Sequence, residues 1–183
     1  MSNEIDRPLL ILDLDETLVS SSRKPREHYD FQVAEHYVVV RPDLEHFLGQ
    51  VFQWYDVAVW TSSGESYATD LVPAIFPDPS QLEFCWAAPR CTRRFDFDRH
   101  QHYAVKDLKK VRRRGYALER VVMIDDSPEK LERNYGNHLR ISSFEDDPDD
   151  RELVAVLPFL EWLKEQPDFR AIEKRNWRTR DVQ

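Results

Sequence analysis

The sequence predicts one α/β domain built on a central parallel sheet, and three features support this prediction. Apolar runs at 8–13, 55–60 and 121–124 lack polar alternation, which is typical of strands buried on both faces. Helical patterns stand between these runs, as a parallel sheet requires. A chain of 183 residues, 41% hydrophobic and 33% charged, has the size and composition of one globular domain.

A hairpin and a helix are predicted between the first two buried runs. Polar residues at 20–27 predict a loop, and 31–33 and 37–40 read as two short strands. Pro42 and Asp43 open a helix, because Pro is favoured near the first helical position. One face of this helix carries the apolar residues Leu44, Phe47, Leu48 and Val51.

The middle of the chain alternates between regular and irregular segments. A helix is expected from 65 to about 75. Residues 77–103 are rich in Pro, Arg and aromatic side chains, which predicts an irregular insertion of short strands and loops. A short helix at 107–114 is expected to end at Gly115.

The last third contains one further strand and a long helix. The Ser-Pro pair at 127–128 is a good helix start, and 138–141 reads as a strand. The pattern at 149–166 predicts a final helix, which Pro158 should kink or split. The polar tail at about 167–183 is expected to fray.

Charge and composition restrict the possible partners and compartments. The net charge is −8, yet the window 90–114 holds ten Lys or Arg against three acids, a local charge of +7. This strip fits an anionic substrate or partner, or simply a solvated helix face. No apolar run approaches the roughly 18 residues of a membrane helix, and the N-terminus lacks a basic leader, so a cytoplasmic protein without membrane contact is expected.

Acidic pairs at two predicted strand ends are the centre of the functional argument. Asp13 and Asp15 end one buried run, Asp125 and Asp126 end another, and Thr61 follows the third. The carboxyl ends of parallel strands meet at one sheet edge, where chemistry gathers. Carboxylates this close repel one another unless a cation lies between them, which favours a Mg²⁺ site and therefore phosphoryl chemistry. The alternative is that each aspartate only caps a turn after its strand.

Four segments occur in the order of the motifs of the haloacid dehalogenase superfamily. They are DLDET at 13–17, WTSS at 60–63, VKDL at 105–108 and IDDSP at 124–128. The chain more closely resembles the small C-terminal-domain phosphatases, also called nuclear-LIM-interactor-interacting-factor-like (NIF-like) phosphatases. This likeness covers most of residues 8–163, including RPDLEHFL at 41–48, DLKKV at 107–111 and LPFLEWL at 157–163.

The resemblance implies a haloacid dehalogenase Rossmann-like core within a single phosphatase domain spanning 1–183. It also implies a β-hairpin flap at about 16–41, which agrees with the hairpin predicted above. A small β insertion is implied between the second and third motifs, at about 77–104.

Roles for individual residues are implied by the same resemblance. Asp13 would be the nucleophile that forms an aspartyl-phosphate, and Asp15 would serve as general acid and then general base. Thr61, Ser62 and Lys106 would bind the phosphoryl group. Mg²⁺ would be held by Asp13, the backbone carbonyl of Asp15, and the acidic pair Asp125 and Asp126.

Two positions, those of Asp126 and Arg90, do not match the pattern of these phosphatases in full. Close relatives usually carry Asn at the position of Asp126, so Asp there adds a negative charge beside the metal. Arg90 stands near the position of an anion-contacting arginine in relatives and is a tentative substrate-binding residue; an exposed arginine is the alternative. Tyr67 and Trp86 could line the substrate groove, although core packing is preferred.

The predicted function is therefore Mg²⁺-dependent hydrolysis of a phosphomonoester, with a phosphoprotein as one possible substrate. Small phosphate esters and nucleic-acid ends are alternatives, and nucleic acid is not favoured. A catalytically silent binding module and phosphoryl transfer to another acceptor also stay open. Zinc binding by Cys85, Cys91, His100 and His102 is disfavoured because their spacing fits no standard pattern.

Overall fold

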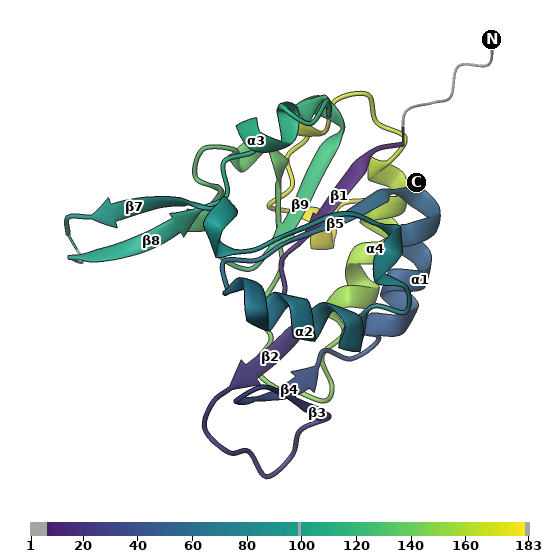
Figure 1. The fold of residues 1–183 in the computed structure, drawn as a ribbon. Helices are drawn as coiled ribbons and strands as arrows, with labels where there is room; N and C mark the ends of the chain where they lie inside the picture. Colours follow the sequence, from purple (N-terminus) through teal and green to yellow (C-terminus); the bar gives the residue numbers. More distant parts are fainter. Residues whose placement is uncertain (1–6, 99, 182–183) are drawn as a thin grey trace.

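A computed structural model describes residues 7–98 and 100–181, and its centre is a twisted parallel sheet (Figure 1). Within the described residues the sheet has five strands in the order β10-β9-β1-β5-β6. Their bounds are β10 His138–Arg140, β9 Val121–Asp125, β1 Leu9–Leu12, β5 Asp56–Trp60 and β6 Leu82–Trp86. Neighbouring strands pair in parallel, so the predicted α/β class is confirmed.

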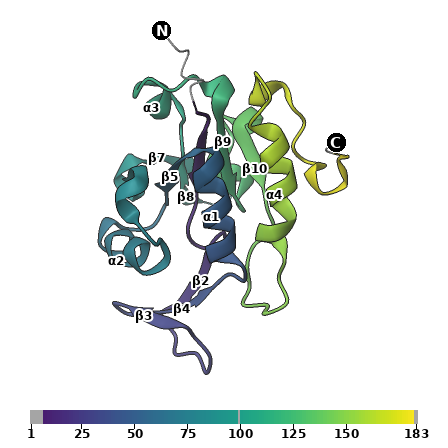
Figure 2. The same cartoon turned by 90° about the vertical axis from the view of Figure 1, so that its right-hand side faces the viewer.

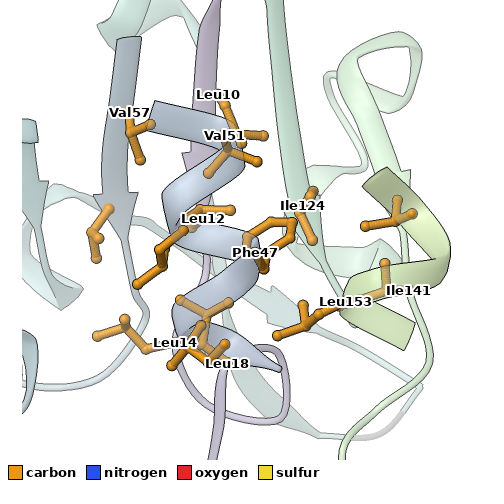
Figure 3. Close-up of a cluster of buried hydrophobic side chains, with 14 of the residues drawn as sticks. Leu10, Leu12, Leu14, Leu18, Phe47, Val51, Val57, Ile124, Ile141 and Leu153 are labelled. Atoms are coloured by element: carbon orange, nitrogen blue, oxygen red, sulfur yellow. The ribbon is translucent and has the colours of Figure 1, made fainter. Parts of the chain in front are cut away.

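The central strand β1 is buried on both faces, which explains its unbroken apolar sequence. Leu10 and Leu12 lie in one hydrophobic cluster, and Leu9 and Ile11 lie in another on the opposite side. Phe47 belongs to the first cluster and lies over the strand together with its apolar neighbours (Figure 3). A strand with no solvent face has no reason to alternate polar and apolar residues.

Helices cover the sheet on both faces. On one face α1 (Leu44–Trp54) and α4 (Glu152–Leu163) lie side by side, and α2 (Glu65–Ile75) contributes to the same core (Figure 2). The short α3 (Lys109–Arg112) packs against the other face. None of the helices in the described part of the chain is long and apolar enough to cross a membrane.

Proline does not split the last helix, one of the two outcomes that the sequence predicted for Pro158. Helix α4 continues through Pro158. The missing N–H at this position would have bonded to the carbonyl of Val154, which is on an exposed side of the helix. Water can therefore satisfy that carbonyl, and the apolar face of α4 keeps its packing.

A flap follows β1 and extends away from the body of the protein (Figure 1). It contains β2 (Val19–Ser22), β3 (Phe31–Val33) and β4 (His36–Val40), paired antiparallel in the order β2-β4-β3. The predicted hairpin is thus present, but β2 overlaps a segment predicted as loop. Val19 pairs with Val40, so this strand depends on a contact that no local pattern reveals.

The predicted insertion at about 77–104 divides into two parts. Short strands were predicted here, and β6 is one, but it joins the central sheet beside β5 instead of forming part of an insertion. As an edge strand, β6 buries only Phe84 and Trp86, so its apolar run is interrupted. The remainder forms an antiparallel hairpin of β7 (Thr92–Asp96) and β8 (Gln101–Val105), which projects from the domain (Figure 1).

The described part of the tail is packed rather than frayed, which corrects the sequence prediction. Phe169 and Trp177 are buried among core residues, and the Trp177 indole donates a hydrogen bond to the Arg140 carbonyl at 2.9 Å. Lys174 is also buried and donates to the Ile172 carbonyl at 2.8 Å. Two aromatic anchors hold a segment whose average composition is polar; residues 1–6, 99 and 182–183 lie outside the described residues.

The packed tail leads to a stability prediction. Phe169→Ala should lower the free energy of unfolding by about 3 kcal/mol, because it leaves a cavity at a fully buried position. Phe97→Ala is the matched control, since Phe97 is 79% exposed on the projecting hairpin and should change stability by less than about 0.5 kcal/mol. Urea unfolding measures both variants. If Phe169→Ala lowers the free energy of unfolding no more than Phe97→Ala does, the tail contributes nothing to the stability of the core.

Candidate active site

The ends of β1 and β9 bring two buried carboxylates together. These strands pair with Leu12 opposite Ile124, and the Asp13 amide donates to the Ile124 carbonyl at 3.0 Å. Asp13 and Asp125 are therefore neighbours at the carboxyl edge of the sheet, as the sequence predicted. Both side chains are almost inaccessible to solvent, so each needs a compensating cation.

Lys106 supplies one of these cations. Its Nζ lies 2.8 Å from Asp13 Oδ1 and 2.6 Å from Asp125 Oδ2, and its side chain is fully buried. The residue follows β8, where its amide donates to the Lys130 carbonyl at 2.7 Å. The predicted phosphate-binding lysine thus bridges the two strand-end carboxylates.

Lys130 is a second cation at this cluster, and the sequence analysis missed it. Its Nζ lies 2.8 Å from Asp13 Oδ2, 3.5 Å from Asp125 Oδ1 and 3.8 Å from Asp126 Oδ1. The residue belongs to a 3₁₀ turn at Pro128–Leu131, which begins at the helix start predicted from the Ser-Pro pair. A lysine in the first turn after a strand-end acidic pair was the available signal, because that turn folds back over the strand ends.

Burial and charge act in opposite directions on these groups. Burial raises the pKa of Asp13, but Lys106 and Lys130 outweigh this effect and hold its pKa below the usual range. Burial, followed by the charge of Asp13, raises the pKa of Asp125 to about 6. Burial lowers the pKa of Lys130, yet attraction to Asp13 and Asp125 prevails and raises it. Asp13 is therefore ionised at neutral pH, as a nucleophile must be.

Asp13, Asp125 and Asp126 form a carboxylate group that could hold a metal ion. One oxygen from each side chain lies within 4.8 Å of the others, and the residues described include no other such group. These three acids carry three formal negative charges against two positive charges from Lys106 and Lys130, a net charge of −1. An all-oxygen donor set with excess negative charge fits a hard divalent cation such as Mg²⁺.

Asp15 lies in a cage of hydroxyl groups that come from three parts of the chain. Ser21 of the flap donates to Oδ1 at 3.0 Å, and Ser63 after β5 donates to Oδ2 at 2.6 Å. Tyr67 of α2 donates to Oδ1 at 2.7 Å. Burial and Asp15 raise the pKa of Tyr67, so this hydroxyl keeps its proton and stays a donor. The cage fixes the position of the carboxylate while leaving it beside the pocket.

An open pocket of about 650 Å³ lies between the flap and the start of α2. Asp15, Ser62 and Lys130 line it, whereas Asp13 lies beneath its surface. Thr61 is also buried, and its Oγ1 accepts a hydrogen bond from the Ser63 amide at 3.0 Å. The flap side of the pocket is formed by Ser21, Arg23, Ala34, Glu35 and His36.

Arg90 does not join this cluster. It lines a separate pocket with Glu65, and its guanidinium lies 5.3 Å from the ring centre of Trp86. Trp86 packs in the core, as preferred from the sequence, whereas Tyr67 both packs and reaches Asp15. The structure therefore gives Arg90 no direct contact with the strand-end acids.

The hydroxyl cage leads to a prediction about Tyr67. Tyr67→Phe should keep the ring packing and remove one donor to Asp15, which lowers turnover of a phosphate ester about tenfold. Steady-state kinetics on an aryl phosphate measures the effect. Tyr135→Phe is the control, because Tyr135 is 84% exposed and lies outside this pocket. Unchanged turnover in Tyr67→Phe would mean that the hydrogen bond from the Tyr67 hydroxyl does not contribute to the function of Asp15.

Comparisons with known proteins find similar sequences over most of the chain. The sequence profile of the NLI interacting factor-like phosphatases matches residues 8–170. A "Probable C-terminal domain small phosphatase" of Dictyostelium discoideum is 35% identical over 179 residues, covering 91% of this chain and 55% of the relative. A CTD nuclear envelope phosphatase 1 homolog of Drosophila melanogaster is 31% identical over 188 residues, covering 94% of this chain and 74% of the relative. This chain thus spans about half the length of the Dictyostelium protein.

Solved structures show the same fold at lower identity. A variant of the fission yeast RNA polymerase II CTD phosphatase Fcp1, bound to beryllium fluoride, aligns with a TM-score of 0.60 and 18% identity over 80% of this chain and 44% of that chain. An uncharacterized protein from Listeria monocytogenes serotype 4b aligns with a TM-score of 0.58 and 18% identity, covering 87% of this chain and 99% of that chain. The profile match over most of the chain confirms the resemblance, and the chain belongs to the NLI interacting factor-like phosphatase family.

Proposed function

We propose that this protein is a Mg²⁺-dependent phosphomonoesterase that acts through an aspartyl-phosphate at Asp13. One observation carries the proposal: Asp13 is held ionised between two lysines, while Asp15 stands two residues away in the neighbouring pocket. A carboxylate nucleophile and a separate proton-transfer carboxylate are what a two-step hydrolysis requires.

In the first step Asp13 attacks phosphorus, and the bond between phosphorus and the ester oxygen breaks. Asp15 gives its proton to the departing alkoxide, which leaves as an alcohol. In the second step Asp15 removes a proton from water, and the resulting hydroxide attacks the aspartyl-phosphate. Inorganic phosphate leaves, and both carboxylates return to their starting forms. One group serves both steps because their proton demands are opposite.

The remaining residues hold and neutralise the phosphoryl group. Lys106 contacts the nucleophile directly and offsets charge that builds on the phosphoryl oxygens. Thr61 and Ser62 follow β5 and are proposed to donate hydrogen bonds to those oxygens. Mg²⁺ would be bound by Asp13, Asp125 and Asp126, where its charge reduces repulsion between a carboxylate and an anionic ester.

A phosphoprotein is the proposed substrate class. The relatives are named as C-terminal domain and nuclear envelope phosphatases, and the pocket of about 650 Å³ beside the flap gives Asp15 an opening to solvent. Nucleic-acid ends remain the alternative, because Arg93 and Arg94 stand exposed on the projecting hairpin. A cytoplasmic location stays a prediction from the sequence.

Phosphate release tests this proposal. An aryl phosphate, a phosphoserine peptide and a 5′-phosphorylated oligonucleotide are compared, each with Mg²⁺ and with a chelator. Mg²⁺-dependent release, fastest from the peptide, is expected. Arg90→Ala is the control, because Arg90 lies in a different pocket and should keep most activity. A folded protein that releases no phosphate from any of the three would favour the silent binding module.

A further inference from the structure

Lys130 lies between the nucleophile and the pocket through which substrate must arrive. Asp13 is only 1% exposed, and its two oxygens are in contact with Lys106 and Lys130. Lys130 lines the pocket itself, whereas Lys106 is fully buried. In this arrangement phosphorus cannot reach Asp13 Oδ2 until the Lys130 ammonium group moves aside.

The same ammonium group lies among the carboxylates that could bind metal. Its Nζ is within 3.8 Å of an oxygen on each of Asp13, Asp125 and Asp126. These are the residues of the candidate metal group. An ammonium group and a divalent ion cannot share so small a space, since like charges repel strongly at low effective dielectric.

We propose that Lys130 is a displaceable internal cation, which occupies the metal position in the metal-free protein and yields it when Mg²⁺ binds. The proposal rests on the proposed function for the identity of the metal. Lys130 lies in a 3₁₀ turn, and its side chain is 15% exposed, so the ammonium group can reach the pocket. The displaced ammonium group then lies beside Asp15 and Ser62, where it binds a phosphoryl oxygen of the substrate.

This arrangement predicts opposite effects on two affinities. Removing the competing cation should tighten Mg²⁺ binding, and removing the phosphoryl contact should weaken substrate binding. A lysine with a purely structural role would not produce this pair of changes. A lysine that only binds substrate would change the second affinity and leave the first unaltered.

The test is calorimetric titration of Mg²⁺ into substrate-free wild type, Lys130→Met and Lys130→Arg. Lys130→Met should bind Mg²⁺ at least about tenfold more tightly and show a KM for aryl phosphate about tenfold higher, while Lys130→Arg should stay close to wild type for Mg²⁺. Lys109→Met is the matched control, because it removes the same charge from an exposed position. Lys130→Gln repeats the experiment with a polar side chain if Lys130→Met does not fold.

The outcomes separate this inference from the proposed function. If Lys130→Met binds Mg²⁺ no more tightly than wild type does, the internal-cation proposal is overturned. If the wild-type protein still releases phosphate in a Mg²⁺-dependent reaction, the phosphatase proposal stands. Mg²⁺ binding to Lys130→Met but not to wild type would also overturn the internal-cation proposal, because the ammonium group would then not be displaced by the metal. No binding in either protein would overturn it, and the phosphate-release assay would then judge the phosphatase proposal independently.

Discussion

Asp13→Asn is expected to lower kcat/KM for an aryl phosphate by at least about 10⁴-fold. The amide oxygen is a far weaker nucleophile than a carboxylate, and no neighbouring group in the cluster can replace it. Asp125 is engaged by Lys106, and Asp15 is held by hydroxyl donors in the pocket. The loss should fall mainly on kcat, since the pocket that receives the ester is unchanged.

Two controls accompany this measurement. Asp149→Asn makes the same chemical change at an exposed position and should keep wild-type activity. Circular dichroism and urea unfolding show whether Asp13→Asn is folded. A folded Asp13→Asn protein that retains more than a tenth of wild-type turnover would be incompatible with Asp13 as nucleophile.

Lys106→Met is expected to cost about 3–5 kcal/mol of stability in the absence of metal, because it removes the fully buried one of the two lysines that neutralise Asp13 and Asp125. The replacement has a similar length and no charge. Asp13 keeps its contact with Lys130, but Asp125 loses its 2.6 Å partner. Added Mg²⁺ should recover part of the loss, since a divalent ion can neutralise the same oxygens.

Urea unfolding with and without Mg²⁺ measures this effect. Lys109→Met is again the matched control and should stay within about 0.5 kcal/mol of wild type. A loss below about 1 kcal/mol in Lys106→Met would argue that the buried ion pairs contribute little to the folded state.

The buried strands, and the aspartates at their ends, could be predicted from short stretches of the sequence. β1 and β9 are buried on both faces, so their apolar runs were visible without alternation. Asp13 and Asp125 could be brought together from the sequence, because parallel strands end at the same edge. That parallel strands end at the same edge follows from backbone geometry and can be used without knowledge of side-chain packing.

The features that the sequence did not reveal depend on contacts between distant segments. The cage around Asp15 uses Ser63 and Tyr67, which are 48 and 52 residues away along the chain. Lys130 reaches Asp13 across 117 residues. The packing of Phe169 depends on a core assembled from other elements. No periodicity within a short window records such contacts, so the hydroxyl cage and the packed tail became visible only in the structure.

Chemical trapping of the intermediate tests the central claim most directly. The protein is mixed with aryl phosphate and Mg²⁺, quenched during turnover and treated with borohydride, which reduces an acyl phosphate to an alcohol. Mass spectrometry should then find homoserine at position 13, only when substrate was present and not in Asp13→Asn. Turnover without modification of Asp13, or a phosphoryl group on another side chain, would contradict the mechanism.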